Sequence, residues 1–64
     1  MLKMKEERIN KGITGAKLAR ITGLNPSTIS SIETRHAFPY PKQAESIAKA
    51  LKWQGDPADL FKEA

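Results

Sequence analysis

The chain has no cysteine and a single histidine among its 64 residues. Without cysteine, neither a disulfide frame nor a thiolate zinc site can hold the fold together. The lone histidine, His36, has no partner ligands, so counting ligands argues against a metal site. We therefore expect no metal and no cofactor. The lack of cysteine also fits a reducing cytoplasm, and we expect a cytoplasmic protein.

Long apolar runs and catalytic groupings are lacking as well. No apolar stretch approaches the roughly 18 residues of a membrane span, and charged residues within positions 3–8 interrupt any resemblance to a signal peptide. No serine has a base partner other than His36, and no glycine-rich phosphate cradle is present. We therefore expect neither membrane insertion nor enzymatic activity. A chain this short makes one small domain over residues 1–64, with a correspondingly small core.

Positive charge is present and unevenly placed. Residues 1–42 hold eight Lys and Arg against three acidic residues, whereas residues 43–64 hold three Lys against four acidic residues. A basic first two-thirds indicates a side that faces a polyanion such as nucleic acid. The alternative is an ordinary solvated basic surface, and charge alone does not decide between the two.

Helix signals dominate and strand signals are absent, which predicts an all-α, compact bundle of about five short helices. Start and stop signals divide the chain: Gly12 and Gly23 as ends, Thr14 and Asn25 as caps, and Asp56 before a last short helix. The helices are expected over about residues 2–11, from the Thr14 cap to Gly23, over 26–34 and 42–52, and from Pro57 in a short last helix that carries Leu60 and Phe61. The fourth carries an apolar stripe of Ala44, Ile47, Ala48 and Leu51.

The stretch GLNPSTISSIE, residues 23–33, reads as a loop by composition but carries a helix start. Pro26 suits the first helical position, and it pushes Asn25 toward the extended conformation that a capping residue needs. On a helix over 26–34, Ile29 and Ile32 share one face, and Thr28 sits at the boundary. The opposite face is uncharged and hydroxyl-rich, and it contains Ser27, Ser30, Ser31 and Thr34.

Two interpretations of the hydroxyl face are open. Exposed helix faces usually carry Lys, Glu or Gln, because serine and threonine are mediocre helix formers. Small side chains allow close approach to another molecule, and hydroxyls donate or accept hydrogen bonds. The alternative is that the face is simply exposed and neutral.

The spacing of Ala19, Gly23, Ile29 and Ile32 is that of a helix-turn-helix, over about residues 14–34.

Residues 8–51 resemble the phage repressor and Cro-type (XRE-like) helix-turn-helix family, whose fold is the lambda-repressor-like DNA-binding domain. The segments that carry the resemblance are Gly12-Ile13-Thr14, Leu18-Ala19, Gly23-Leu24, Ser27-Thr28-Ile29-Ser30, Ile32-Glu33, Pro39 and Ile47-Ala48-Lys49-Ala50-Leu51. The resemblance implies that the helix from Pro26 enters the major groove of double-stranded DNA. It implies base contacts from Pro26, Ser27, Thr28, Ser30 and Ser31.

The resemblance also assigns phosphate contacts and one structural ion pair. The phosphate-contacting set is expected to comprise Thr14, Gly15, Asn25, Thr34, Arg35, His36, Tyr40 and Lys42. Arg8 and Glu33 match a pair that ties the first helix to the recognition helix. Gly15 departs from the family pattern, in which a glutamine usually holds a phosphate. Pro26 and Ser31 also depart from it, because many relatives carry Arg, Gln or Lys on the reading face.

Two large aromatic residues keep two interpretations each. Tyr40, between two prolines, either reaches a phosphate or packs against the domain. Trp53 either packs against the last helix or lies in a dimer contact, as in relatives. Lys17 and Arg20, on the outer side of the second helix, are expected to face solvent.

We expect a sequence-specific DNA-binding protein, a small bacterial or phage transcriptional regulator of repressor type. It would bind as a homodimer to a partly palindromic operator, with half-sites about one helical turn apart. We expect no small-molecule effector site within the chain, which is either a minimal regulator or the DNA-binding part of a longer protein. The alternative is a protein-interaction module on the same fold, such as an antitoxin or an antirepressor.

Overall fold

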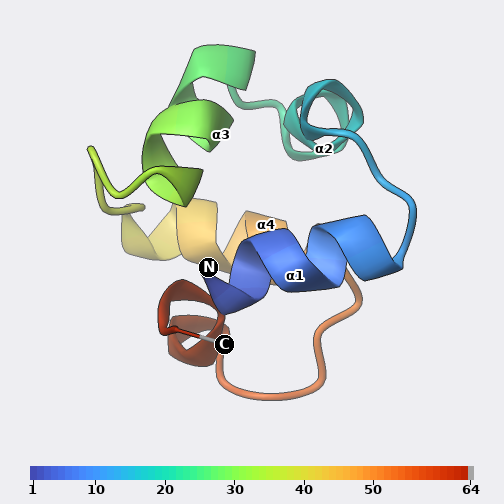
Figure 1. Ribbon diagram of the computed structural model, residues 1–64, viewed down its shortest axis with the longest axis vertical. Coiled ribbons are helices and arrows are strands. Elements are labelled where there is room, and N and C mark those ends of the chain that lie inside the picture. The colour runs from blue at the N-terminus through green and yellow to red at the C-terminus, as the bar shows by residue number, and fades with distance from the viewer. Residues whose placement is uncertain (64) are drawn as a thin grey trace.

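The computed structural model describes residues 1–63 and contains four α-helices and one 3₁₀ helix (Figure 1). The all-α fold class is confirmed, with the correction that the fifth element is a 3₁₀ helix. Within the described residues, no helix has the length and apolarity needed to cross a membrane. The elements are α1 (Lys3–Asn10), α2 (Gly15–Thr22), α3 (Pro26–Glu33), α4 (Pro41–Ala50) and η1 (Pro57–Phe61).

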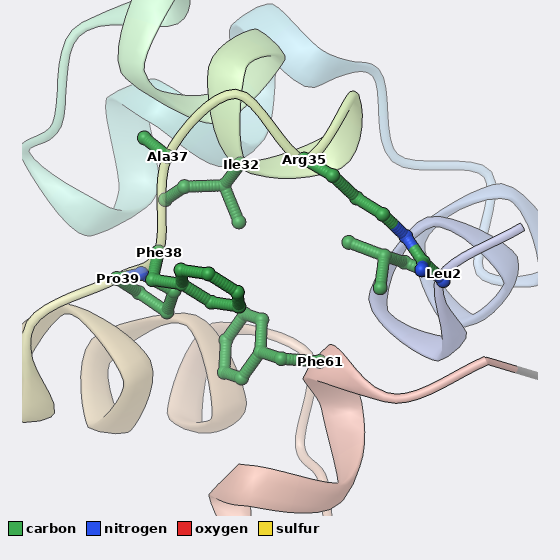
Figure 2. Close-up of a pocket in the computed structure, with 7 residues that line it drawn as sticks. All are labelled: Leu2, Ile32, Arg35, Ala37, Phe38, Pro39 and Phe61. Atoms are coloured by element: carbon green, nitrogen blue, oxygen red, sulfur yellow. The ribbon is translucent and has the colours of Figure 1, made fainter.

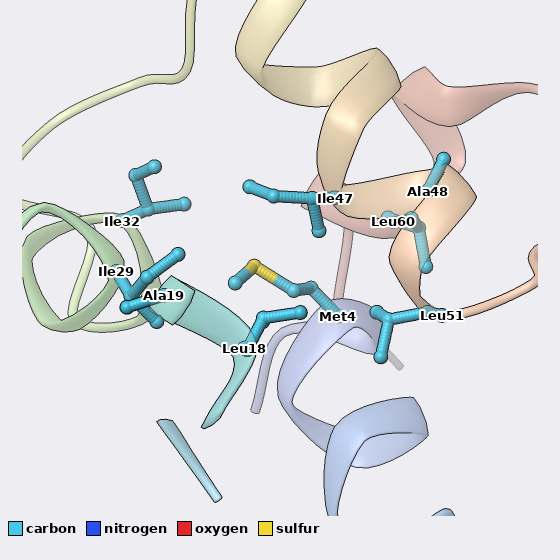
Figure 3. Close-up of a cluster of buried hydrophobic side chains, with 9 residues drawn as sticks. All are labelled: Met4, Leu18, Ala19, Ile29, Ile32, Ile47, Ala48, Leu51 and Leu60. Atoms are coloured by element: carbon cyan, nitrogen blue, oxygen red, sulfur yellow. The ribbon is translucent and has the colours of Figure 1, made fainter. Parts of the chain in front are cut away.

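One apolar core lies between the helices and receives side chains from every element (Figure 3). The α2 helix packs against both α3 and α4, and η1 packs against α4 and α1. The buried side chains come from the stripes that the sequence predicts on α2, α3 and α4, together with Leu60 of η1 and Met4 of α1. Each of these short helices depends on this packing, because isolated helices of eight to ten residues are unstable in water.

The first helix contributes a core residue that its sequence pattern does not reveal. Met4 is completely buried, whereas most of α1 around it is charged. Leu2, also buried, forms an isolated antiparallel bridge with Glu63, and the Lys3 N–H donates to the carbonyl of Lys62 at 2.9 Å. The two ends of the described chain therefore lie side by side.

Helix starts follow the predicted caps with one exception. Thr14 Oγ1 accepts from the Lys17 N–H at 3.0 Å, and Asp56 Oδ1 accepts from the Ala58 N–H at 2.9 Å. Asn25 has the expected extended backbone, but its side chain makes no capping hydrogen bond. The fourth helix begins at Pro41, one residue earlier than predicted, and the Gln43 side chain accepts from the Tyr40 N–H.

All four α-helices end in the same way, with a residue in the left-handed conformation. These residues are Gly12 (φ 69°), Gly23 (φ 75°), Arg35 (φ 65°) and Lys52 (φ 54°). After each of them, the next N–H donates back to a carbonyl five residues earlier, which is the long hydrogen bond of the Schellman motif; an example is Trp53 N–H to Ala48 O at 2.9 Å. The sequence predicts the two glycine ends but not the ends at Arg35 and Lys52.

This difference yields a stability prediction. Lys52→Gly should raise the free energy of unfolding by up to about 1 kcal/mol, because glycine adopts the left-handed conformation without the steric cost that a Cβ adds. Gly12→Ala is the matched reverse change and should lower stability by a similar amount. A Cβ at Gly12 meets no atom within 4 Å, so only the backbone conformation opposes it. Urea denaturation measures both; shifts of the same sign would contradict the argument.

Candidate nucleic-acid interface

The helix pair α2 and α3 is joined by a tight turn built on Gly23. The Leu24 N–H donates to the Ala19 carbonyl at 3.0 Å, which closes the end of α2. Ala19 is 2% exposed, and its small side chain lets the two helices approach closely. Thr22 also contributes, since its hydroxyl donates to the Leu18 carbonyl at 2.8 Å. The turn therefore has the glycine and the small residue where the sequence predicts them.

The α3 helix is held by its apolar side and leaves its polar side open. Ile29 and Ile32 are 1% and 2% exposed, so they anchor the helix to the core. Pro26, Ser27 and Ser30 are exposed, and Thr28 and Ser31 are partly exposed. The predicted amphipathic arrangement of this helix is thus present, with the hydroxyl face directed away from the core.

The serine hydroxyls on this face make no hydrogen bond within the described part of the domain, whereas the Thr34 hydroxyl does. The side-chain hydrogen bonds of α3 and its carboxyl end involve Glu33 and Thr34. Within residues 1–63, no hydrogen bond joins the hydroxyls of Ser27, Thr28, Ser30 or Ser31 to another group of the chain. These groups are consequently able to bond to another molecule without breaking a contact inside the domain.

An ion pair between Arg8 and Glu33 connects α1 to the carboxyl end of α3. Arg8 Nε–H donates to Glu33 Oε2 at 2.7 Å, and Nη2–H donates to Oε1 at 3.1 Å. A third bond runs from Arg8 Nη1–H to the carbonyl of Ile13 at 2.8 Å. The Arg8 and Glu33 side chains are 13% and 9% exposed. The only acidic residue of α3 is therefore neutralised, and the orientation of α3 is set by two-point contact with a rigid guanidinium.

The start of α2 contains two of the residues expected to contact DNA phosphates, Thr14 and Gly15. Thr14 is exposed and its hydroxyl caps the helix, while Gly15 occupies the first helical position. A Cβ built on Gly15 meets nothing within 4 Å, so the space for a larger side chain is open. The absence of a side chain at position 15 is therefore not a packing requirement of this fold. Any phosphate contact at Gly15 would have to come from the backbone N–H.

The residues just after α3 are engaged with their own chain. The Thr34 hydroxyl donates to the Ser30 carbonyl at 2.9 Å and lies 2.8 Å from Nδ1 of His36. The single hydroxyl hydrogen of Thr34 is thereby used, and a phosphate contact from it would require breaking that bond. Arg35 Nη2 lies 2.7 Å from Glu63 Oε2. Sequence reasoning missed this partner, because no local pattern links positions 35 and 63.

Tyr40 and Lys42 flank the start of α4 and are both exposed. The Tyr40 side chain is 74% exposed, which rules out the packing alternative for this residue. Trp53 instead packs against the core, and its Nε1–H donates to the Asp56 carbonyl at 2.9 Å. The interpretation of Trp53 as a packing residue of the last helix is therefore the one that the structure supports.

Some of the cations are paired and others are not. Ion pairs engage Lys3, Arg8, Lys11, Arg35 and Lys62. The cations without a carboxylate within 4.0 Å, among residues 1–63, are Lys5, Lys17, Arg20, Lys42, Lys49 and Lys52. Uncompensated positive charge therefore lies on α2, which packs against α3, and on α4, which packs against α2, as well as at Lys5 of α1 and Lys52 after α4. In the same described part, no group of three His, Cys, Asp or Glu residues is placed to hold a metal ion.

Two helices joined by a glycine turn, with the second anchored on its apolar side and open on the other, define a helix-turn-helix domain. A family model described as helix-turn-helix matches residues 4–52. The chain therefore belongs to the XRE-type helix-turn-helix family of DNA-binding regulators. Neither the curated proteins nor the solved structures contain a match to this chain.

Proposed function

We propose that this chain binds double-stranded DNA sequence-specifically with α3 in the major groove. It would act as a small bacterial or phage transcriptional regulator of repressor type. The observation that carries the proposal is that the hydroxyls of Ser27, Ser30 and Ser31 on α3 are at least partly exposed, lie on an uncharged face and make no hydrogen bond within residues 1–63. An α-helix with its side chains is about 10–12 Å in diameter and the major groove is about 12 Å wide, so α3 can enter the groove, and its small outward side chains allow close approach to the base edges.

The roles of the α3 side chains follow from their positions. Ser27 and Ser31 would lie nearest to the base edges, with Pro26, Thr28 and Ser30 beside them. Arginine bound in a bidentate manner to guanine, worth about 1–3 kcal/mol of discrimination, is unavailable from this helix. Sequence discrimination would rest on hydroxyl contacts, thymine methyl packing, bridging water and DNA shape.

The phosphate contacts in the proposal come from both sides of α3. Thr14, Gly15 and Asn25 lie at the starts of α2 and α3, and Lys42 at the start of α4 is an exposed cation with no acidic partner among residues 1–63. Tyr40 would contribute its exposed hydroxyl. Three further phosphate contacts would require breaking contacts within the chain. Thr34 and His36 would release their hydrogen bond to each other, and Arg35 would release Glu63. The protein would bind as a homodimer, with half-sites about one helical turn apart.

Salt dependence tests the proposal directly. We expect the logarithm of the association constant to fall linearly with the logarithm of salt concentration, with a slope of about −0.9 for each phosphate neutralised. Fluorescence anisotropy on duplexes selected from a random pool measures it. Lys42→Gln should make the slope less negative by about 0.9, the value for one phosphate. Lys62→Gln, a change just after η1, is the control and should leave the slope unchanged.

The alternative function, a protein-interaction module such as an antitoxin or antirepressor, makes the opposite prediction. Such a protein would use the neutral face of α3 for a protein partner and would show no binding to random or genomic DNA at low salt. Absence of binding in that assay would overturn the DNA proposal and favour the alternative.

A further inference from the structure

Arg35, one of the residues proposed to contact phosphate, is already paired with a carboxylate of its own chain. Its Nη2 lies 2.7 Å from Glu63 Oε2. Lys42, the lysine of the proposed phosphate set, has no carboxylate within 4.0 Å among residues 1–63. A neighbouring anion lowers the positive potential that a guanidinium presents to a phosphate, because the two charges oppose each other. The chain therefore holds one proposed DNA contact in a partly neutralised state.

The position of Glu63 is set by backbone pairing between the two ends of the described chain. Glu63 forms an isolated antiparallel bridge with Leu2, and the Lys3 N–H donates to the Lys62 carbonyl at 2.9 Å. Leu2 is buried, so the segment that receives Glu63 is itself fixed to the domain. The fold therefore brings this carboxylate to the end of α3, and the ion pair does not depend on two freely moving side chains alone.

The Arg35 side chain is also placed by its surroundings. Its backbone is left-handed, with φ 65°, at the point where the chain leaves α3. Figure 2 shows the side chain running from the end of α3 toward Leu2, along a small apolar hollow of about 70 Å³ whose walls include Phe61 and the exposed ring of Phe38. The aliphatic stem of an arginine packs on apolar surface while its charged end stays in water. Backbone conformation and packing therefore direct the guanidinium toward the paired chain ends.

We propose that Glu63 competes with DNA phosphate for Arg35, so that the segment 62–63 lowers the affinity of this chain for DNA. The proposal rests on the proposed function and adds a contact within the chain that regulates the same site. A carboxylate and a phosphate offer a guanidinium the same kind of acceptor, two oxygen atoms that fit its planar fork of N–H groups. Arg35 meets a phosphate at full strength only after Glu63 has moved away, because two anions on one guanidinium repel each other.

Two features limit the size of this inhibition. The Arg35 and Glu63 side chains are 51% and 60% exposed, and an ion pair this exposed is weak because water and salt screen it. The amino group of Met1 lies 3.3 Å from Glu63 Oε2, so the carboxylate keeps a cation when Arg35 leaves. The exchange therefore needs no unfolding of the domain, and Glu63 is expected to lower DNA affinity by about fivefold, the upper end for an exposed pair.

The experiment measures DNA affinity by fluorescence anisotropy at low salt, on the duplex that the wild-type chain selects from a random pool. We expect Glu63→Gln to bind about fivefold more tightly than the wild-type chain. Asp59→Asn is the matched control, because it also removes one negative charge and breaks an exposed ion pair, 3.0 Å from Lys62 Nζ. Lys62 is not a proposed DNA contact, so this variant should change affinity by less than about twofold.

A double-mutant cycle separates competition for Arg35 from a general effect of charge. Arg35→Gln should weaken binding, because one phosphate contact is lost. Adding Glu63→Gln to Arg35→Gln should change affinity by less than about twofold, since no guanidinium remains for the carboxylate to occupy. A fivefold gain in that background would mean that Glu63 acts through net charge, and it would overturn the proposal. Equal affinities of Glu63→Gln and the wild-type chain would overturn it as well. Both outcomes leave DNA binding itself intact, so the proposed function would stand.

A second measurement needs no DNA. The Nε–H signal of Arg35 is recorded by NMR in the free chain, and we expect it to shift in Glu63→Gln and to stay in place in Asp59→Asn. An unshifted signal in Glu63→Gln would show that the ion pair does not form, and the proposal would fall whatever the DNA affinities. Failure of every variant to bind DNA would remove the proposed function and the competition with it. Thermal denaturation verifies that each variant keeps the fold, as expected for exposed positions.

Discussion

Ser27→Glu is expected to lower the affinity of the chain for its selected duplex by at least about 100-fold, because like-charge contacts across an interface cost several kcal/mol. Ser27 is exposed in the first turn of α3, on the face proposed to lie in the major groove. A carboxylate there would oppose the phosphates and the acceptor atoms of the bases. Fluorescence anisotropy at constant salt measures the change.

The same substitution should not harm the fold, which makes the test selective. A negative charge in the first turn of a helix is favourable by about 0.3–1 kcal/mol, because it interacts with the positive end of the helix dipole. The melting temperature of Ser27→Glu should therefore stay level or rise. Ser31→Glu, one turn further along α3, should also abolish binding. Because Ser31 is partly buried, the melting temperature of this variant is measured as well.

Gln54→Glu is the matched control for charge. Gln54 is exposed in the segment between α4 and η1, and its substitution adds one negative charge. We expect less than about a threefold change in affinity, since an exposed charge far from the interface is screened within roughly 10 Å at 0.1 M salt. Equal losses in Gln54→Glu and Ser27→Glu would show that net charge, and not the face of α3, controls binding.

Arg8→Ala should destabilise the domain by about 2 kcal/mol, because removing one partner of this largely buried ion pair leaves the other charge without compensation. Glu33, 9% exposed, would lose both of its hydrogen bonds to the guanidinium, and the Ile13 carbonyl would lose a third. For a domain of this size the melting temperature should fall by about 15 °C. Thermal and urea denaturation measure the loss.

Two further variants separate the ion pair from general effects of mutation. Arg20→Ala removes an exposed arginine of α2 that has no carboxylate within 4.0 Å among the described residues, and it should change the melting temperature by no more than about 4 °C. The double variant Arg8→Met/Glu33→Met should be more stable than Arg8→Ala, because no buried charge remains unpaired. Equal melting temperatures of Arg8→Ala and Arg20→Ala would show that the Arg8–Glu33 ion pair does not stabilise the domain.

Much of the helix-turn-helix was accessible from sequence because its signals are local. Gly23 at the turn, Pro26 at a helix start, and Ile29 with Ile32 at helical spacing each report a backbone state or a face within a few residues. The Arg8–Glu33 pair came from the family resemblance. Its three hydrogen bonds and its burial came from the structure. The DNA contacts remain a proposal for every residue of the predicted set.

Other features of the site were not accessible from sequence. The engagement of Arg35 by Glu63 joins residues that are distant in the chain, and Arg35 and Lys52 adopt a left-handed conformation that usually marks glycine. Asn25 looked like a side-chain cap and is not one. The exposure of Phe38 and Tyr40 depends on which neighbours the fold brings next to them, so the sequence left the packing of Tyr40 open and gave no indication for Phe38.

The sequence by itself determined the helix starts to within one residue, the helix ends at Gly12 and Gly23, the apolar stripes and the hydroxyl face of α3, because each is encoded by signals within one or two helical turns. The tertiary structure alone decided that Met4 fills the centre of the core, that the ends of the described chain pair, and that an aromatic ring stands beside an apolar hollow. These features arise from contacts between distant segments, and such contacts exist only once the helices have packed.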